Sequence, residues 1–329
     1  MVLEALIEEK QLLRTPSFML LEAIIISSIA LWTSHYIFPA SSSVLSIAFV
    51  TIALVPLIHS VFIEEEKIEE IKPGSPIGFI GRHFELIKIY GFFFLGLVIS
   101  YTLWFSFLPV SNVDYCLSEG LCVDVPGKDN VFKEQLNTIQ GIENLKANVT
   151  GLAVGGNEIT GQVTLPSGCS KNISCVFELI FFNNANVLLF AVILSFVYGA
   201  GALMLLGWNA SVIGVVIGQN VLAQNHFSFI GLMPHGIPEI MAYFLAAISG
   251  ELIGLAMIKK HTMKRMSKLL LIDSLVILII SLVILLIGAV IETLLIFKEE
   301  VIAIILSVLF IVLFAALVFK GLKERQVWF

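Results

Sequence analysis

The stretch that decides the fold runs from Phe182 to Ile258. It reads FNNANVLLFAVILSFVYGAGALMLLGWNASVIGVVIGQNVLAQNHFSFIGLMPHGIPEIMAYFLAAISGELIGLAMI. Asparagine, glycine, proline, histidine and glutamate residues interrupt sequence that is otherwise apolar. In a membrane, each such residue costs free energy unless packing or function compensates. The stretch therefore predicts membrane helices that are broken or closely packed at defined points.

The composition excludes a water-soluble globular protein. The 329-residue chain is 58% hydrophobic and 13% charged, with a mean hydropathy of +0.97, whereas soluble domains are about 45–50% apolar and about 25% charged. Its apolar residues form runs of about 20, enough to cross a hydrocarbon layer ~30 Å thick. The predicted fold class is an all-α polytopic transmembrane bundle in the cell membrane, with the lipid bilayer as a partner. No basic-aromatic patch points to nucleic acid.

The apolar runs predict about eight spans. They lie at 17–38, 43–63, 86–108, 184–206, 209–228, 238–258, 269–291 and 301–319. The fifth run is the weakest, because it is interrupted by four side-chain amides, those of Gln219, Asn220, Gln224 and Asn225. Segment 209–228 therefore either spans the membrane or forms a re-entrant pair with a neighbour.

Lysine and arginine residues predict the orientation, because they are enriched on the cytoplasmic side. With both termini inside, fourteen of the nineteen lie at the cytoplasmic side or edge, namely Lys10, Arg14, Lys67, Lys72, Arg82, Lys88, Lys259, Lys260, Lys264, Arg265, Lys268, Lys320, Lys323 and Arg325. Segment 184–206 then enters from outside, and the basic cluster 259–268 is inside. The chain between them crosses an even number of times or folds back, so His235 and Glu239 are expected toward the outer side.

The long segment 109–183 is predicted to be a small extracytoplasmic subdomain. All four cysteines lie in it, as two C-x5-C pairs, Cys116 with Cys122 and Cys169 with Cys175. We expect disulfides, with local pairing as the favoured connectivity, because the segment contains no histidine and C-x5-C is a poor zinc spacing. A zinc site is the alternative.

The same segment carries further local patterns. Val131–Leu145 has the spacing of a short amphipathic helix, and Asn148–Leu165 alternates like two short strands. Asn148 and Asn172 begin N-x-S/T sequons, which are candidate glycosylation sites. The chain thus divides into an N-terminal two-helix part at 1–85, a core at 86–258 and a C-terminal two-helix part at 259–329.

Small residues in the opening stretch predict close helix packing. They are Gly214 and Gly218 in one helix and Ala242, Ala246, Gly250 and Gly254 in another. Small side chains allow neighbouring helices to approach closely in lipid. Packing within the chain is the favoured interpretation, and a homodimer interface is the alternative.

Four polar positions are the candidate functional residues: Asn209, His235, Glu239 and Glu251. The segment Pro234–Glu239 predicts a rigid turn with Pro238 at the first position of the next helix, where His235 could hydrogen-bond to Glu239 or Asn209. One histidine and one carboxylate make half a metal site, and H-E-x-x-H is absent. No metal, cofactor or catalytic residue is therefore predicted.

The order of these elements resembles the stage II sporulation protein M family. The resemblance rests on Asn183-Asn184, the glycines at 201 and 207, Asn209, the Gly-rich segment and the Pro-His-Gly-Ile-Pro-Glu sequence, and it covers roughly 86–258. Ala210 stands where the family commonly has glycine. The resemblance implies an integral membrane protein without established catalytic activity, whose endospore-forming members act as a scaffold that recruits cell-wall-remodelling partners during engulfment.

The leading functional hypothesis is therefore a membrane scaffold or assembly factor of the cell envelope, acting through protein partners and not as an enzyme. A transporter or channel that uses the broken 209–239 region is the alternative. An intramembrane hydrolase using His235 and Glu239 ranks third.

Overall fold

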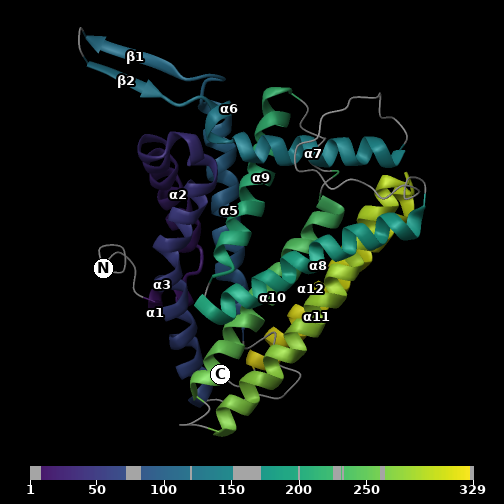
Figure 1. The fold of residues 1–329 in the computed structure, drawn as a ribbon. Helices are drawn as coiled ribbons and strands as arrows, with labels where there is room; N and C mark the ends of the chain where they lie inside the picture. The colour runs from purple at the N-terminus through teal and green to yellow at the C-terminus, as the bar shows by residue number, and fades with distance from the viewer. Residues whose placement is uncertain are drawn as a thin grey trace.

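Long apolar helices make up most of the structure, and a two-stranded sheet projects from one end (Figure 1). The computed structural model describes residues 9–71, 83–118, 121–150, 172–198, 201–224, 231, 233–259 and 264–326. Within these residues, seven helices are long and apolar enough to cross a membrane, and Glu300–Ala316 forms a shorter apolar helix. The prediction of a multi-pass helical membrane protein is confirmed.

The elements follow one another along the chain as α1 (Glu9–Arg14), α2 (Phe18–Ile37), the 3-10 helix η1 (Pro39–Ser41), α3 (Ser42–Ile71), α5 (Phe84–Phe107), β1 (Val113–Ser118), β2 (Leu121–Val125), α6 (Lys128–Val131), α7 (Lys133–Thr150), α8 (Ile173–Tyr198), α9 (Leu203–Leu222), α10 (Met233–Lys259), α11 (Lys264–Ile296) and α12 (Glu300–Gln326).

The helices form two groups that converge at one end of the molecule and diverge at the other (Figure 1). The first group contains α2, α3, α5 and α9, and the second contains α8, α10, α11 and α12. Near the convergent end, the Tyr90 ring of α5 lies between Phe62 of α3 and Phe244 of α10. At the divergent end, α7 crosses from α3 and α9 to α11. Helix α7 therefore bridges the two groups.

Helices α8 and α9 meet at a buried turn. Ala202 and Leu203 are fully buried, and the Ala202 backbone N–H donates a hydrogen bond to Ser195 Oγ at 3.3 Å. Helix α9 then runs along only the second half of α5, where a side chain at Gly207 would meet Leu97 and one at Gly218 would meet Phe105. Helix α9 thus begins beside the middle of α5 rather than at its end.

The predicted boundaries of these two helices are wrong. The sequence predicted spans at 184–206 and 209–228, but α8 covers Ile173–Tyr198 and α9 covers Leu203–Leu222. The hydropathy pattern misses the turn, because a turn built of glycine and alanine is as apolar as the helices beside it. The segment between α5 and α8 is correspondingly shorter than the predicted 109–183, since α8 begins at Ile173.

The predicted rigid turn at Pro234–Glu239 is also wrong, because α10 begins at Met233 and continues through Pro238. Pro234 occupies the first turn, where backbone N–H groups have no intrahelical partner in any case. Pro238 has no N–H for the carbonyl of Pro234, and that carbonyl instead accepts a hydrogen bond from Ser307 Oγ of α12 at 3.3 Å. The helix therefore tolerates both prolines.

The projecting sheet was not predicted. Strands β1 and β2 form an antiparallel hairpin in which Val113 lies opposite Val125 and Cys116 lies opposite Cys122. Among the described cysteine side chains none is a free thiol. Helix α7 corresponds to the amphipathic helix expected at Val131–Leu145. The strands expected at Asn148–Leu165 begin in its last turn and otherwise lie outside the described residues, as does Cys169.

Candidate functional site

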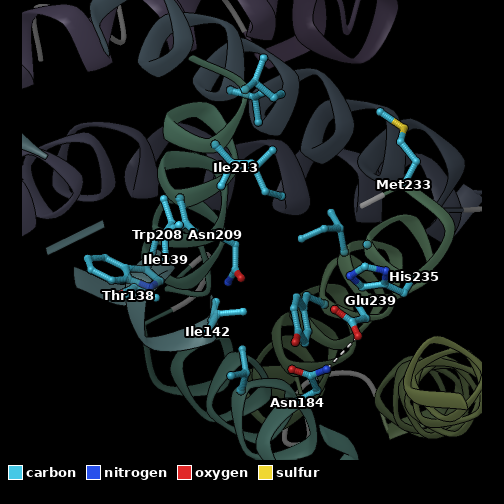
Figure 2. A pocket seen from close by; sticks show the side chains of 18 of the residues that line it. Thr138, Ile139, Ile142, Asn184, Trp208, Asn209, Ile213, Met233, His235 and Glu239 are labelled. Carbon is cyan, nitrogen blue, oxygen red and sulfur yellow. Dashed lines mark hydrogen bonds between the residues drawn. The ribbon is translucent and has the colours of Figure 1, made fainter. Parts of the chain in front are cut away.

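A cavity of about 1810 Å³ separates the two helix groups at the divergent end. Its walls come from α5 and α9 on one side and from α8, α10 and the end of α11 on the other, with α7 contributing along its length. Figure 2 shows the two walls facing each other, with Ile213 of α9 on one side and Met233 of α10 on the other.

Polar groups from three helices meet in this cavity. Asn184 Nδ2 of α8 donates a hydrogen bond to Glu239 Oε1 of α10 at 2.9 Å. His235 precedes Glu239 by about one helical turn, and Figure 2 shows the imidazole beside the carboxyl group. Asn209 extends into the same space from α9 on the opposite wall.

Three of the four candidate residues from the sequence thus line one cavity: Asn209, His235 and Glu239. The hydrogen bonds seen in this cluster are those of Glu239 and Asn209, and the expected bond of His235 stays a prediction. Glu239 Oε1 is bonded to Asn184, and Asn209 Nδ2 donates to the Leu205 carbonyl of its own helix at 2.8 Å. Asn184 is a hydrogen-bond partner of Glu239. Helical spacing could not reveal this pair, because the two residues lie on different helices.

Glu251 does not line the cavity. Its side chain is 1% exposed, and its Oε1 lies 2.7 Å from Nδ1 of His59 in α3. This contact joins α3 of the first helix group to α10 of the second. His59 was overlooked in the sequence, although an ionisable residue within the apolar run at 43–63 was a signal for it.

The ionisable groups that line the cavity are mostly acidic. They are Glu134 and Glu143 of α7, Glu239 of α10, Glu292 of α11 and His235. The lining residues include no lysine and no arginine. Within the described part of the chain, no group of three histidine, cysteine or carboxylate side chains is placed to hold a metal ion. The cavity can therefore bind a polar group through carboxyl, amide and imidazole hydrogen bonds beside an apolar surface.

The small residues pack within the chain. Side chains at Gly214 and Gly218 would overlap Tyr101 and Phe105 of α5, at 2.8 and 2.7 Å. On α10, the backbone at Gly250 lies against Val192 and Ser195 of α8, and Gly254 lies against Phe196. The glycines of α9 and α10 thus contact different helices rather than each other. Ala242 and Ala246 are fully buried.

A bundle of apolar helices with a polar cavity defines a polytopic helical membrane protein. The family described as stage II sporulation protein M matches residues 89–295, which is more than half of the chain. The chain belongs to this family. No curated protein and no solved structure matches it.

The matched region differs from the expected one at its C-terminal end. The resemblance in the sequence ended near 258, whereas the match continues to Leu295 and includes nearly all of α11. The cavity lies almost wholly within the match, since its lining residues run from Gly91 to Ile296. Helices α2, α3 and α12 lie outside it.

Proposed function

We propose that this protein is a non-catalytic scaffold or assembly factor of the cell envelope, and that α7 and the β1–β2 hairpin form its extracytoplasmic contact surface. The observation that carries this proposal is the firm attachment of these elements to the membrane helices. A surface that is fixed in position binds a partner without first losing conformational entropy.

Gln135 attaches α7 to two membrane helices. Its side chain is 1% exposed. Its Oε1 accepts a hydrogen bond from Ser43 Oγ of α3 at 2.6 Å, and its Nε2 donates one to Ser211 Oγ of α9 at 3.1 Å. A buried amide that is bonded on both sides is costly to displace, because its polar groups would lose their partners.

The preceding segment is attached through aromatic and polar contacts. The Phe132 ring packs edge-on against Tyr101 and Phe105 of α5. In the hairpin, Tyr36 Oη of α2 donates to the Asp124 carbonyl at 3.2 Å, and His35 Nε2 lies 3.4 Å from Asp124 Oδ2. Two helices of the first group, α2 and α5, thus hold the hairpin and its connection to α7.

The exposed side of this surface is mainly acidic. Its exposed carboxylates are Asp114, Asp124, Asp129, Glu134 and Glu143. Complementary charge speeds association and disfavours wrong partners. We therefore propose that the partner presents a basic surface to α7 and the hairpin.

We propose that the α7 end faces the outside and that both termini are cytoplasmic. Helix α10 ends and helix α11 begins at the end opposite α7 (Figure 1), and these helix ends carry Lys259, Lys264, Arg265 and Lys268, as expected for the cytoplasmic side. The start of α9 beside the middle of α5 supports the re-entrant alternative for α8 and α9, in which this pair enters from the outer side and turns within the bundle.

An extracytoplasmic position also supports the predicted disulfides. Cys116 and Cys122 are cross-strand neighbours in the hairpin, an arrangement that brings Cα atoms within about 4.5–5.5 Å of each other, as a disulfide requires. Alkylation of the unfolded, unreduced protein should label no cysteine. A thiol at Cys116 or Cys122 would contradict the local pairing.

The scaffold proposal is tested by purification from native membranes after crosslinking. The wild-type chain should retain a specific envelope protein, and the charge-reversed variant Asp129→Lys with Glu143→Lys should lose at least ten-fold of it. Asn130→Lys is the control, because it adds one positive charge at an exposed position without removing a carboxylate. It should lose much less of the retained protein. Equal recovery with all three chains would contradict binding through the acidic surface.

A transporter or channel is the second candidate, and the cavity is the observation that favours it. A polar path across the bundle would be expected to include Glu251 and Asp273. Neither residue is among those that line the cavity. Purified protein in sealed vesicles tests this alternative. Flux of ions or small solutes that Glu239→Gln abolishes would favour transport over scaffolding.

A further inference from the structure

We propose that the cavity between the two helix groups binds an amphiphilic lipid whose head group is uncharged or cationic and donates hydrogen bonds. This inference concerns the interior of the bundle, whereas the scaffold proposal concerns the exposed side of α7 and the hairpin. The carboxylates that the two sites share are Glu134 and Glu143 of α7, which are exposed and also line the cavity.

The size of the cavity indicates a ligand larger than a small metabolite. Pockets for drug-sized molecules occupy about 300–1,000 Å³, whereas this cavity has about 1810 Å³. A lipid with a long hydrocarbon chain is the class of membrane molecule that fits such a space.

The lining changes character with depth. Toward the convergent end, the walls are apolar, with Phe94 and Leu95 of α5, Val187 of α8, Leu205 of α9 and Phe244 of α10. Toward α7, the walls carry the polar groups, including all four lining carboxyl groups. A hydrocarbon chain would gain free energy in the first part by burying apolar surface. A polar head would find hydrogen-bond partners in the second.

The polar part selects the head group by charge. Its carboxyl groups and amide oxygens accept hydrogen bonds, and the Asn184–Glu239 pair lies at its centre opposite Asn209 (Figure 2). No lysine or arginine lines the cavity. Phosphate and carboxylate head groups would therefore meet like charge with no cation to pair with, whereas a hydroxyl or amine head would be stabilised.

The shape favours a lipid over the transmembrane helix of a partner protein. A spanning helix must pass through both ends of the site. At the convergent end, the groups are closed by the ring contacts of Tyr90 with Phe62 and Phe244 and by the His59–Glu251 contact. A lipid needs only one entrance.

Photolabelling of the full chain in vesicles tests the proposal. Three probes carry the same C18 chain with a diazirine near its end: a monoacylglycerol, a long-chain amine and a fatty acid. Each is added at low mole fraction, and the labelled peptides are mapped by mass spectrometry. We expect saturable labelling of peptides around Phe94, Val187 and Phe244, with the monoacylglycerol or the amine labelling at least five-fold more than the fatty acid.

Two variants and a control make the result specific. Glu239→Gln keeps the shape of the head-group site and should lower labelling by the preferred probe about five-fold or more. Gly91→Phe should block the tail site, and it should leave the backbone in place because an added Cβ there meets no atom within 4 Å. Glu178→Gln changes the same residue type at an exposed position of α8 that does not line the cavity, and it should alter labelling less than two-fold.

Several results would overturn the proposal. These are equal labelling by all three probes, labelling spread over lipid-facing positions such as Ile305 of α12, or labelling unchanged by both Glu239→Gln and Gly91→Phe. Preference for the amine would identify a cationic head, and preference for the monoacylglycerol a hydroxyl head. Both of these results support the site.

Discussion

At the scale of single residues, the His59–Glu251 contact is the clearest polar link between the two helix groups. Glu251 is 1% exposed and His59 is 39% exposed, so the pair has one buried and one accessible member. Removing one partner from such a pair leaves a buried polar group without its hydrogen bond. Removing both partners avoids that cost.

A double-mutant cycle tests this link. His59→Leu alone should lower the free energy of unfolding by about 1–3 kcal/mol, because Glu251 loses its partner. His59→Leu combined with Glu251→Leu should recover most of the loss. Reversible unfolding in detergent, followed by loss of helical circular dichroism, measures both. Ser60→Ala, whose hydroxyl bonds only to Leu57 of its own helix, serves as the neutral control. Effects that simply add would contradict the coupling.

The candidate residues show how far a sequence can define a site. Asn209, His235 and Glu239 were recognisable because each is polar within apolar sequence, and the structure places all three on one cavity. The side chains that contact Glu239 and Glu251 were not recognisable as their partners. Asn184 and His59 lie on helices whose relative positions no local pattern specifies, so the Asn184–Glu239 and His59–Glu251 pairs needed the tertiary structure.

At the scale of helices, glycine determines how closely α8 and α10 approach. At Gly250, an added Cβ would overlap the Val192 carbonyl oxygen and lie 2.9 Å from Ser195 Cβ. The small residues of α10 were recognisable in the sequence. The sequence did not show that they pack against α8. The α8–α9 boundary was missed for a related reason, since glycine and alanine serve both in helix contacts and in the buried turn.

Matched glycine substitutions test this packing. Gly250→Ala should lower the free energy of unfolding by about 1–3 kcal/mol, because two helices must separate to admit the methyl group. Gly91→Ala, where an added Cβ meets nothing within 4 Å, should raise it by up to about 1 kcal/mol through helix propensity. Thermal unfolding in detergent compares the two. Equal effects of the two substitutions would show that α8 and α10 are not closely packed at Gly250.

At the scale of the whole molecule, two converging helix groups and the bridging helix α7 account for both proposals. Convergence closes one end of the bundle, and divergence leaves the cavity at the other. Composition predicted the membrane class, and the family resemblance was confirmed by the match over 89–295. The hairpin was not predicted, although apolar and polar residues alternate in both of its strands, Val113–Ser118 and Leu121–Val125.

The central claim is that the surface formed by α7 and the hairpin binds an envelope protein. The most direct measurement is photocrosslinking in native membranes, with a photoreactive amino acid at exposed Asp114 of β1 or at lipid-facing Ile305 of α12. The account predicts a discrete protein adduct from position 114 that is absent from position 305 and is lost when Asp129 and Glu143 are changed to lysine. An Asp114 probe that forms no adduct beyond the Ile305 background would contradict it.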